Sequence, residues 1–158
     1  MKIGFVGLGI MGKPMAKNLM KEGHELLVDD CNADAVNEVV EAGAKAGTKA
    51  EIAENCEVVV TMLPNSPHVK EVVCGASGLL ENAHEGLIII DMSSIAPLAS
   101  QEVAAKCKEK GVHFLEAPVS GGEPKAIDGT LSIMCGGDEE IFEKCELIAK
   151  VKEIEPSE

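Results

Sequence analysis

The chain has 158 residues with 27 acidic and 14 basic side chains, and its formal net charge of −13 argues against nucleic acids and anionic membranes as partners. Hydrophobic residues make up 46% of the chain, enough for one domain with a sizeable core, and no apolar run approaches the roughly 20 residues of a membrane span. The six cysteines are scattered without a Cys-x-x-Cys pair, which is typical of free thiols in a reducing cytoplasm and predicts no metal site.

Short β-branched segments alternate with longer amphipathic segments along the chain. The expected strands are residues 2–6, 25–28, 44–46, 58–63, 87–92, 112–116 and 130–137. The expected helices are residues 11–22, 33–42, 49–54, 67–74, 96–110 and 139–148, with a helical piece near 78–82 and a frayed tail at 151–158. This alternation predicts an α/β fold, a doubly wound and mostly parallel sheet of the Rossmann type.

Glycines at three positions form a G-x-G-x-x-G pattern that follows the first strand and opens the first helix. Gly7 allows a tight turn, Gly9 lets the backbone approach a ligand, and Gly12 lets the helix pack closely on the strand. The N-terminus of that helix presents free N–H groups and the positive end of the helix dipole. The pattern therefore predicts a site for the pyrophosphate of a dinucleotide.

An acidic pair, Asp29 and Asp30, ends the second strand about twenty residues past the glycines. A carboxylate there accepts hydrogen bonds from the adenosine ribose, and strand alternation favours Asp30, although Asp29 remains the alternative. This carboxylate also repels a 2′-phosphate. The next residue is Cys31, and the chain has no arginine that could bind such a phosphate. We therefore expect NAD as the cofactor, with NADP less favoured because only lysines are available to bind its phosphate.

Four segments of the chain resemble the β-hydroxyacid dehydrogenases: "FVGLGIMGKPMAKN", "TMLPNSPHVKEVV", "DMSSIAPLAS" and "APVSGGEPKAIDGTLSIMCGG". The resemblance implies an oxidoreductase that uses NAD(P). It also implies site residues, position by position. The implied cofactor-binding residues are Gly7, Leu8, Gly9, Ile10, Met11, Gly12, Asp30, Leu63, Pro64, Asn65 and Ser94, and the implied substrate-binding residues are Ser120, Gly121 and Gly122.

Two of these assignments have plainer alternatives when the residues are considered alone. Ser94 is also placed to cap the helix that contains Pro97 in its first turn. The "SGG" segment at residues 120–122 also fits an ordinary turn, although successive N–H groups and a hydroxyl there suit an anion such as a carboxylate. Both alternatives stay open at the level of sequence.

The chain departs from the family in one respect. The family's catalytic lysine lies on a long helix after the nucleotide domain, in a G-x-x-G-x-G-x-x-x-K-x-x-N setting, whereas this sequence has no glycine after Gly137 and no asparagine after Asn82. Lys125 belongs to a stretch that is not catalytic in the family. We therefore expect residues 1–158 to be the NAD(P)-binding domain alone, without the helical C-terminal domain, without a catalytic residue and without activity of its own.

Within the family, the wording of the motifs is most similar to members that reduce 2-hydroxy-3-oxopropionate (tartronate semialdehyde) to D-glycerate. Oxidation of 3-hydroxyisobutyrate, or a related β-hydroxyacid reaction, is the alternative. A function of another class, a stand-alone dinucleotide-binding module without catalysis, is also open. We expect a small carboxylate-bearing aldehyde or hydroxy acid as substrate, and a homo-oligomer in the cytoplasm.

Overall fold

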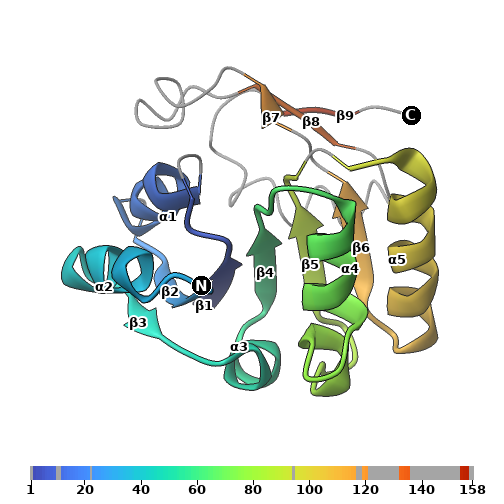
Figure 1. Cartoon of the computed structure of the whole chain (residues 1–158), viewed down its shortest axis with the longest axis horizontal. Coiled ribbons are helices and arrows are strands. Elements are labelled where there is room, and N and C mark those ends of the chain that lie inside the picture. The colour runs from blue at the N-terminus through green and yellow to red at the C-terminus, as the bar shows by residue number, and fades with distance from the viewer. Residues whose placement is uncertain are drawn as a thin grey trace.

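The structure is a computed structural model that describes residues 2–9, 12–21, 23–93, 95–116, 119–120, 132–135 and 154–156. Its main body is built on a six-stranded sheet in the order β3-β2-β1-β4-β5-β6, with every neighbouring pair parallel (Figure 1). The strands are β1 Lys2–Val6, β2 Glu25–Asp29, β3 Lys45–Ala46, β4 Val58–Thr61, β5 Ile88–Asp91 and β6 His113–Glu116. The expected doubly wound α/β fold is confirmed, and its strand order reverses between β1 and β4.

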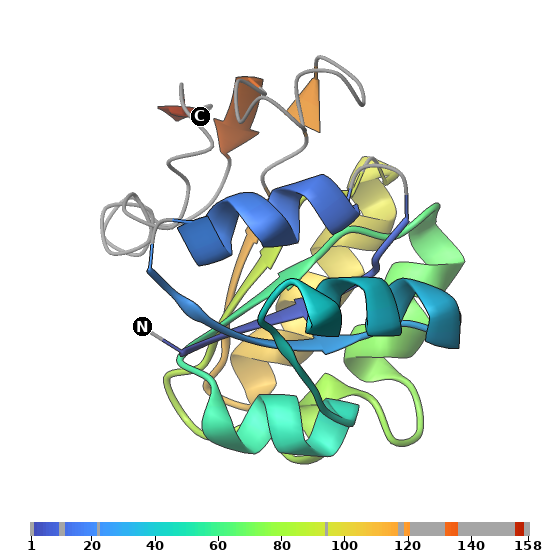
Figure 2. The ribbon, with the colours of Figure 1, turned by 90° about the vertical axis from the view of Figure 1, so that its left-hand side faces the viewer.

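Helices cover both faces of this sheet. They are α1 Gly12–Lys21, α2 Ala33–Glu41, α3 Lys49–Asn55, α4 Ser66–Cys74 and α5 Pro97–Glu109, with a 3₁₀ turn at Leu79–Glu81. One apolar core lies under α1 and α2, which face the viewer in Figure 2, and a second lies under α3, α4 and α5. None of the helices in the described ranges is long and apolar enough to cross a membrane.

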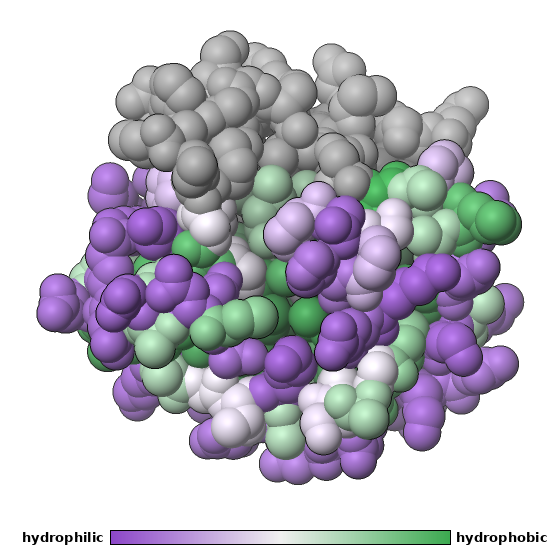
Figure 3. Space-filling view, viewed as in Figure 1, coloured by the Kyte–Doolittle hydropathy of each residue, from purple (hydrophilic) through white to green (hydrophobic). Residues whose placement is uncertain are grey.

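The central strands are buried on both faces, as their continuous apolar runs predict. In β4, Val58 and Val60 pack in the core under α1 and α2, whereas Val59 packs in the core on the opposite face. The outer surface is mainly hydrophilic in the view of Figure 3, in line with the acidic composition. Among the described residues, two large apolar side chains are exposed, Val40 and Leu98.

The starts of two helices confirm the capping residues that the sequence indicates. Asn32 caps α2, because its side chain accepts hydrogen bonds from the backbone N–H groups of Asp34 and Ala35. Thr48 caps α3 in a capping box, in which its hydroxyl accepts from the N–H of Glu51 at 3.2 Å and the Glu51 carboxylate accepts from the N–H of Thr48 at 3.1 Å. The observed bounds of the five helices α1 to α5 differ from the expected ones by at most one residue at either terminus.

A second, three-stranded sheet consists of β7 Val119–Ser120, β8 Ser132–Cys135 and β9 Ile154–Pro156. β7 pairs antiparallel with β8, and β9 pairs parallel with β8. The frayed tail expected at 151–158 is therefore wrong for residues 154–156. The polar composition of this segment does not predict a strand. It forms one because it pairs with β8, which lies about twenty residues away in the chain. The helix expected at 139–148 lies outside the described residues.

Candidate functional site

The turn after β1 requires glycine at its first position. Gly7 has a φ of +105°, a left-handed conformation that side-chain-bearing residues rarely adopt. A Cβ atom at Gly7 would also overlap the backbone carbonyl of Met62 and would lie 3.2 Å from the side chain of Leu63. The glycine turn therefore packs directly against the segment that follows β4.

The other two glycines meet opposite surroundings. A Cβ atom at Gly12 would overlap the carbonyl of Gly7 and would lie 3.4 Å from the ring of Phe5, so α1 packs tightly on the turn and on β1. At Gly9, by contrast, nothing in the described part of the chain lies within 4 Å of such an atom. The turn thus presents bare backbone to open space at Gly9, beside the N-terminus of α1, which is the arrangement that an anion needs.

The two candidate aspartates point to different partners. Asp30 Oδ2 accepts a hydrogen bond from the Leu8 N–H at 2.5 Å, and Asp30 Oδ1 accepts one from the Asn32 N–H at 2.8 Å. Asp29 Oδ2 instead lies 3.6 Å from Nζ of Lys49, at the start of α3. The structure therefore brings the side chain of Asp30, and not that of Asp29, to the glycine turn, whereas Asp29 contacts the turn through its backbone carbonyl, which accepts from the Gly7 N–H at 3.1 Å.

The segment after β4 lies next to the glycine turn. Leu63 is half-buried there, and Pro64 and Asn65 are exposed. Asn65 caps α4: its Oδ1 accepts from the backbone N–H of His68 at 3.4 Å and lies 2.6 Å from Nδ1 of the His68 ring. Because an amide oxygen only accepts, Nδ1 carries the proton in this contact. His68 belongs to none of the candidate sites that the sequence predicts, yet its ring contacts a predicted cofactor-binding residue.

A buried polar network that the sequence patterns do not predict lies at the ends of β4 and β5. Asp91 Oδ1 accepts hydrogen bonds from the Thr61 hydroxyl at 2.9 Å and from the Ser93 N–H at 3.1 Å. The Ser93 hydroxyl in turn accepts from the Leu63 N–H at 2.8 Å. A signal was available, because a polar residue ends each of the two apolar runs, "VVVT" and "IIID".

Several predicted residues cannot be placed in this geometry. Ile10, Met11, Ser94, Gly121 and Gly122 lie outside the described residues, as does Lys125. Ser120 is described only as a backbone position of β7. The residues that the structure does bring together are Gly7, Leu8, Gly9, Gly12, Asp30 and Leu63, with Pro64 and Asn65 following directly.

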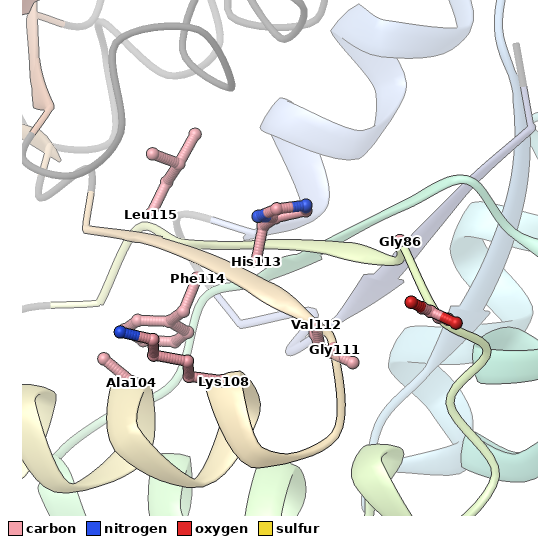
Figure 4. A pocket seen from close by; sticks show the side chains of 9 residues that line it. Gly86, Ala104, Lys108, Gly111, Val112, His113, Phe114 and Leu115 are labelled. Carbon is pink, nitrogen blue, oxygen red and sulfur yellow. The ribbon is translucent and has the colours of Figure 1, made fainter.

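A cavity of about 580 Å³ lies elsewhere, along β6 and the second half of α5. Phe114 points toward Ala104 and Lys108 of α5, whereas His113 and Leu115 project from the other face of β6 (Figure 4). None of the predicted site residues lines this cavity. Since the glycine turn, Asp30 and Leu63 converge at a different place, we assign the candidate site to the turn and not to this cavity.

One family model and several known proteins match this chain. A family model described as the NAD binding domain of 6-phosphogluconate dehydrogenase matches residues 2–151. A probable mitochondrial 3-hydroxyisobutyrate dehydrogenase of Dictyostelium discoideum is 45% identical over 141 residues, which cover 89% of this chain and 44% of that protein. The 2-hydroxy-3-oxopropionate reductase of Escherichia coli (strain K12) is 45% identical over 145 residues, which cover 91% of this chain and 49% of that protein. The chain thus spans about half the length of the curated relatives it matches.

Solved structures also match nearly the whole chain. The Mycobacterium tuberculosis 3-hydroxyisobutyrate dehydrogenase, solved with L-serine, has a TM-score of 0.92 at 32% identity and is matched over 98% of this chain and 53% of that chain. Psf3 in complex with NADP+ and 2-OPP has a TM-score of 0.93 at 25% identity, over 98% of this chain and 56% of that chain. Because a family model of an NAD-binding domain matches nearly all of its length and its relatives are 3-hydroxyisobutyrate dehydrogenases and a 2-hydroxy-3-oxopropionate reductase, the chain belongs to the β-hydroxyacid dehydrogenase family, of which it carries the NAD-binding domain.

Proposed function

We propose that the glycine turn, Asp30 and the segment Leu63–Asn65 bind a nicotinamide dinucleotide. The observation that carries this proposal is the hydrogen bond between Asp30 and the Leu8 N–H, which puts a carboxylate beside the bare backbone of the turn. The backbone of the turn and the N-terminus of α1 suit the pyrophosphate, and Asp30 suits the hydroxyls of the adenosine ribose. When bound, the dinucleotide supplies or accepts a hydride.

NAD is the proposed cofactor, although family membership leaves both dinucleotides open because the solved neighbours include an NADP+ complex. The Asp30 carboxylate repels a 2′-phosphate, and the chain has no arginine to bind one. Lys49 lies near the end of β2, but its ammonium group already pairs with Asp29 at 3.6 Å. These features support NAD over NADP.

The proposed reaction is the reduction of 2-hydroxy-3-oxopropionate to D-glycerate. Following the family motifs, residues 120–122 hold the substrate carboxylate and Ser94 lies beside the nicotinamide. We place the family's catalytic lysine outside this sequence, so that residues 1–158 act as the NAD(P)-binding domain. The lysine stabilises the developing alkoxide and supplies its proton.

Conversion of 3-hydroxyisobutyrate is the second candidate, and one observation favours it as strongly. The Dictyostelium relative with that assignment and the Escherichia coli reductase are equally identical to this chain, at 45%. Both candidates share a small carboxylate-bearing substrate. We also propose that residues 1–158 self-associate, because the family's C-terminal domain would cover apolar surface that these residues alone leave exposed, and light scattering of the purified chain tests this directly.

Titration of the 158-residue chain with NADH, followed by fluorescence, tests the proposed cofactor site. Saturable binding supports the proposal, and a chain that binds neither NADH nor NADPH contradicts it. Joining the chain to the C-terminal half of a relative and comparing the two substrates then separates the two candidate reactions. Faster turnover of 3-hydroxyisobutyrate than of D-glycerate, measured as NAD reduction, would favour the second candidate.

A further inference from the structure

Asp91 is a buried carboxylate at the end of a strand that otherwise consists of isoleucines. It is the last residue of β5, only 1% exposed, and lies in register with Thr61, the last residue of β4. A carboxylate is costly to bury unless several donors satisfy it. A polar group kept at this cost in an apolar strand calls for an explanation beyond the core itself.

The hydrogen bonds around Asp91 link two loops that leave the sheet. Its Oδ1 atom accepts from the Thr61 hydroxyl at 2.9 Å and from the Ser93 N–H at 3.1 Å, so it holds the first turn after β5 against the end of β4. The Ser93 hydroxyl accepts from the Leu63 N–H at 2.8 Å, so this hydrogen bond holds the segment after β4 against Ser93. Thr61 and Ser93 are 0% and 3% exposed, so water does not compete for these bonds.

This network of hydrogen bonds contacts the segment that forms part of the proposed site. The segment that it holds, starting at Leu63, is the one that packs against Gly7 of the glycine turn. The carboxyl ends of β1, β4 and β5 are adjacent in the sheet, at the edge where doubly wound sheets bind their ligands. Displacing Leu63 would therefore move one wall of the site and the support of the turn together.

We infer that Asp91 is a positioning residue for the dinucleotide: through Thr61 and Ser93 it sets the distance between the loops after β4 and β5. The inference rests on the proposed function, since it concerns the same site. Asp91 touches no ligand in this role and takes no part in hydride or proton transfer. Its contribution is to hold Leu63–Asn65 in the binding conformation before the cofactor arrives, which reduces the entropy lost on binding.

A purely structural network would behave differently from a positioning network. Loss of a structural bond lowers the free energy of unfolding but leaves the affinity of the molecules that remain folded unchanged. Loss of a positioning bond also weakens binding in the folded population. The test therefore compares NADH affinity among variants at a temperature where circular dichroism shows all of them folded.

Four variants of the chain make this comparison. Ser93→Ala removes the acceptor of the Leu63 N–H, and Thr61→Val removes the hydroxyl that binds Asp91 with little change in shape. Thr61→Ser restores that hydroxyl. Val58→Ala is the matched control, because Val58 is 3% exposed in the same strand as Thr61 but at its other end.

We expect Ser93→Ala and Thr61→Val to raise the Kd for NADH about tenfold, roughly the loss of one or two hydrogen bonds, with Thr61→Ser recovering most of the affinity. Val58→Ala is expected to lower the melting temperature at least as much while its Kd stays within about twofold. If the unaltered chain binds NADH and all four variants bind it equally well, the inference is overturned and the proposed site stands. If the unaltered chain binds neither NADH nor NADPH, the proposed function fails, and the inference fails with it.

Discussion

The carboxylate of Asp30 accepts a hydrogen bond from the backbone N–H of Leu8, 22 residues earlier in the chain, and so fastens the end of β2 to the glycine turn. The second carboxylate oxygen binds the N–H of Asn32, the residue that caps α2. Both oxygens are therefore oriented by backbone groups before any ligand binds. This fixed carboxylate leads to a prediction about the choice between NADH and NADPH.

NADH should bind the chain at least about tenfold more tightly than NADPH, a difference of about 1.4 kcal/mol, because the Asp30 carboxylate repels a 2′-phosphate. Asp30→Ala should weaken NADH binding and narrow the gap between the two cofactors. Asp29→Ala should affect the NADH affinity much less, since the Asp29 side chain pairs with Lys49 and not with the turn, and the backbone contact of Asp29 with Gly7 is kept in this variant. Fluorescence titrations of the three proteins check this. A larger loss of NADH affinity in Asp29→Ala than in Asp30→Ala would reverse our assignment of the ribose ligand.

The chain should bind NADH without oxidising it when 2-hydroxy-3-oxopropionate is added. Absence of a positioned general acid typically costs a factor of about 10²–10⁴ in rate, and the family's setting for the catalytic lysine is absent from this sequence. Absorbance at the NADH band, followed after substrate addition, should stay flat. Clear turnover that disappears in Lys125→Ala would show that Lys125 is catalytic, contrary to our expectation.

The four cysteines whose exposure the structure describes should react unequally, because Cys31 is exposed whereas Cys56 and Cys107 are buried. Cys31 is exposed next to Asp30, whereas burial raises the pKa of Cys56 to about 11 and that of Cys107 to about 12. At pH 8 a disulfide reagent should modify Cys31 rapidly, and Cys31→Ser should lose one fast equivalent. Saturating NADH should slow this fast phase, because Cys31 borders the proposed ribose site. An unchanged rate with NADH bound would place the ribose elsewhere.

The stability of the fold should fall at alkaline pH because of the two buried thiols. Their pKa values are raised from 9.0 to about 11 and about 12, so between pH 9 and pH 12 the unfolded chain releases thiol protons that the folded chain keeps. The free energy of unfolding therefore decreases as pH rises through this window, and below pH 9 these thiols add no slope. Denaturant titrations across the window measure this, with Cys107→Ala expected to flatten the decline and Cys31→Ser to leave its slope unchanged.

Thr48→Ala should destabilise the fold without changing cofactor binding. The variant removes the side-chain acceptor for the Glu51 N–H at the start of α3. Loss of such a cap typically costs about 1 kcal/mol, which lowers the melting temperature of a domain this size by roughly 2–4 °C. Thermal melts measure the change in melting temperature, and titration with NADH measures the Kd, which should stay unchanged. A tenfold weaker NADH affinity in this variant would show that α3 contributes to the site.

The local elements of this protein follow from its sequence because their signals are local. The alternation of β-branched and amphipathic runs predicts the six parallel strands and their helices, and the capping residues Asn32 and Thr48 mark where α2 and α3 begin. The glycine turn is equally local: the positive φ of Gly7 and the tight packing of Gly12 are properties of a strand that turns sharply into a helix.

Only the tertiary structure decided which polar side chains meet. Both aspartates at the end of β2 suit a ribose, and strand alternation favours Asp30 in the sequence, but only the tertiary structure shows that the turn after β1 lies within hydrogen-bond distance of the Asp30 carboxylate. The network of Asp91 likewise depends on the register that sets Thr61 beside it. The pairing of β9 with β8 was also invisible in a polar tail. These contacts join residues that are distant in sequence, so strand order and register determine which of the polar residues meet.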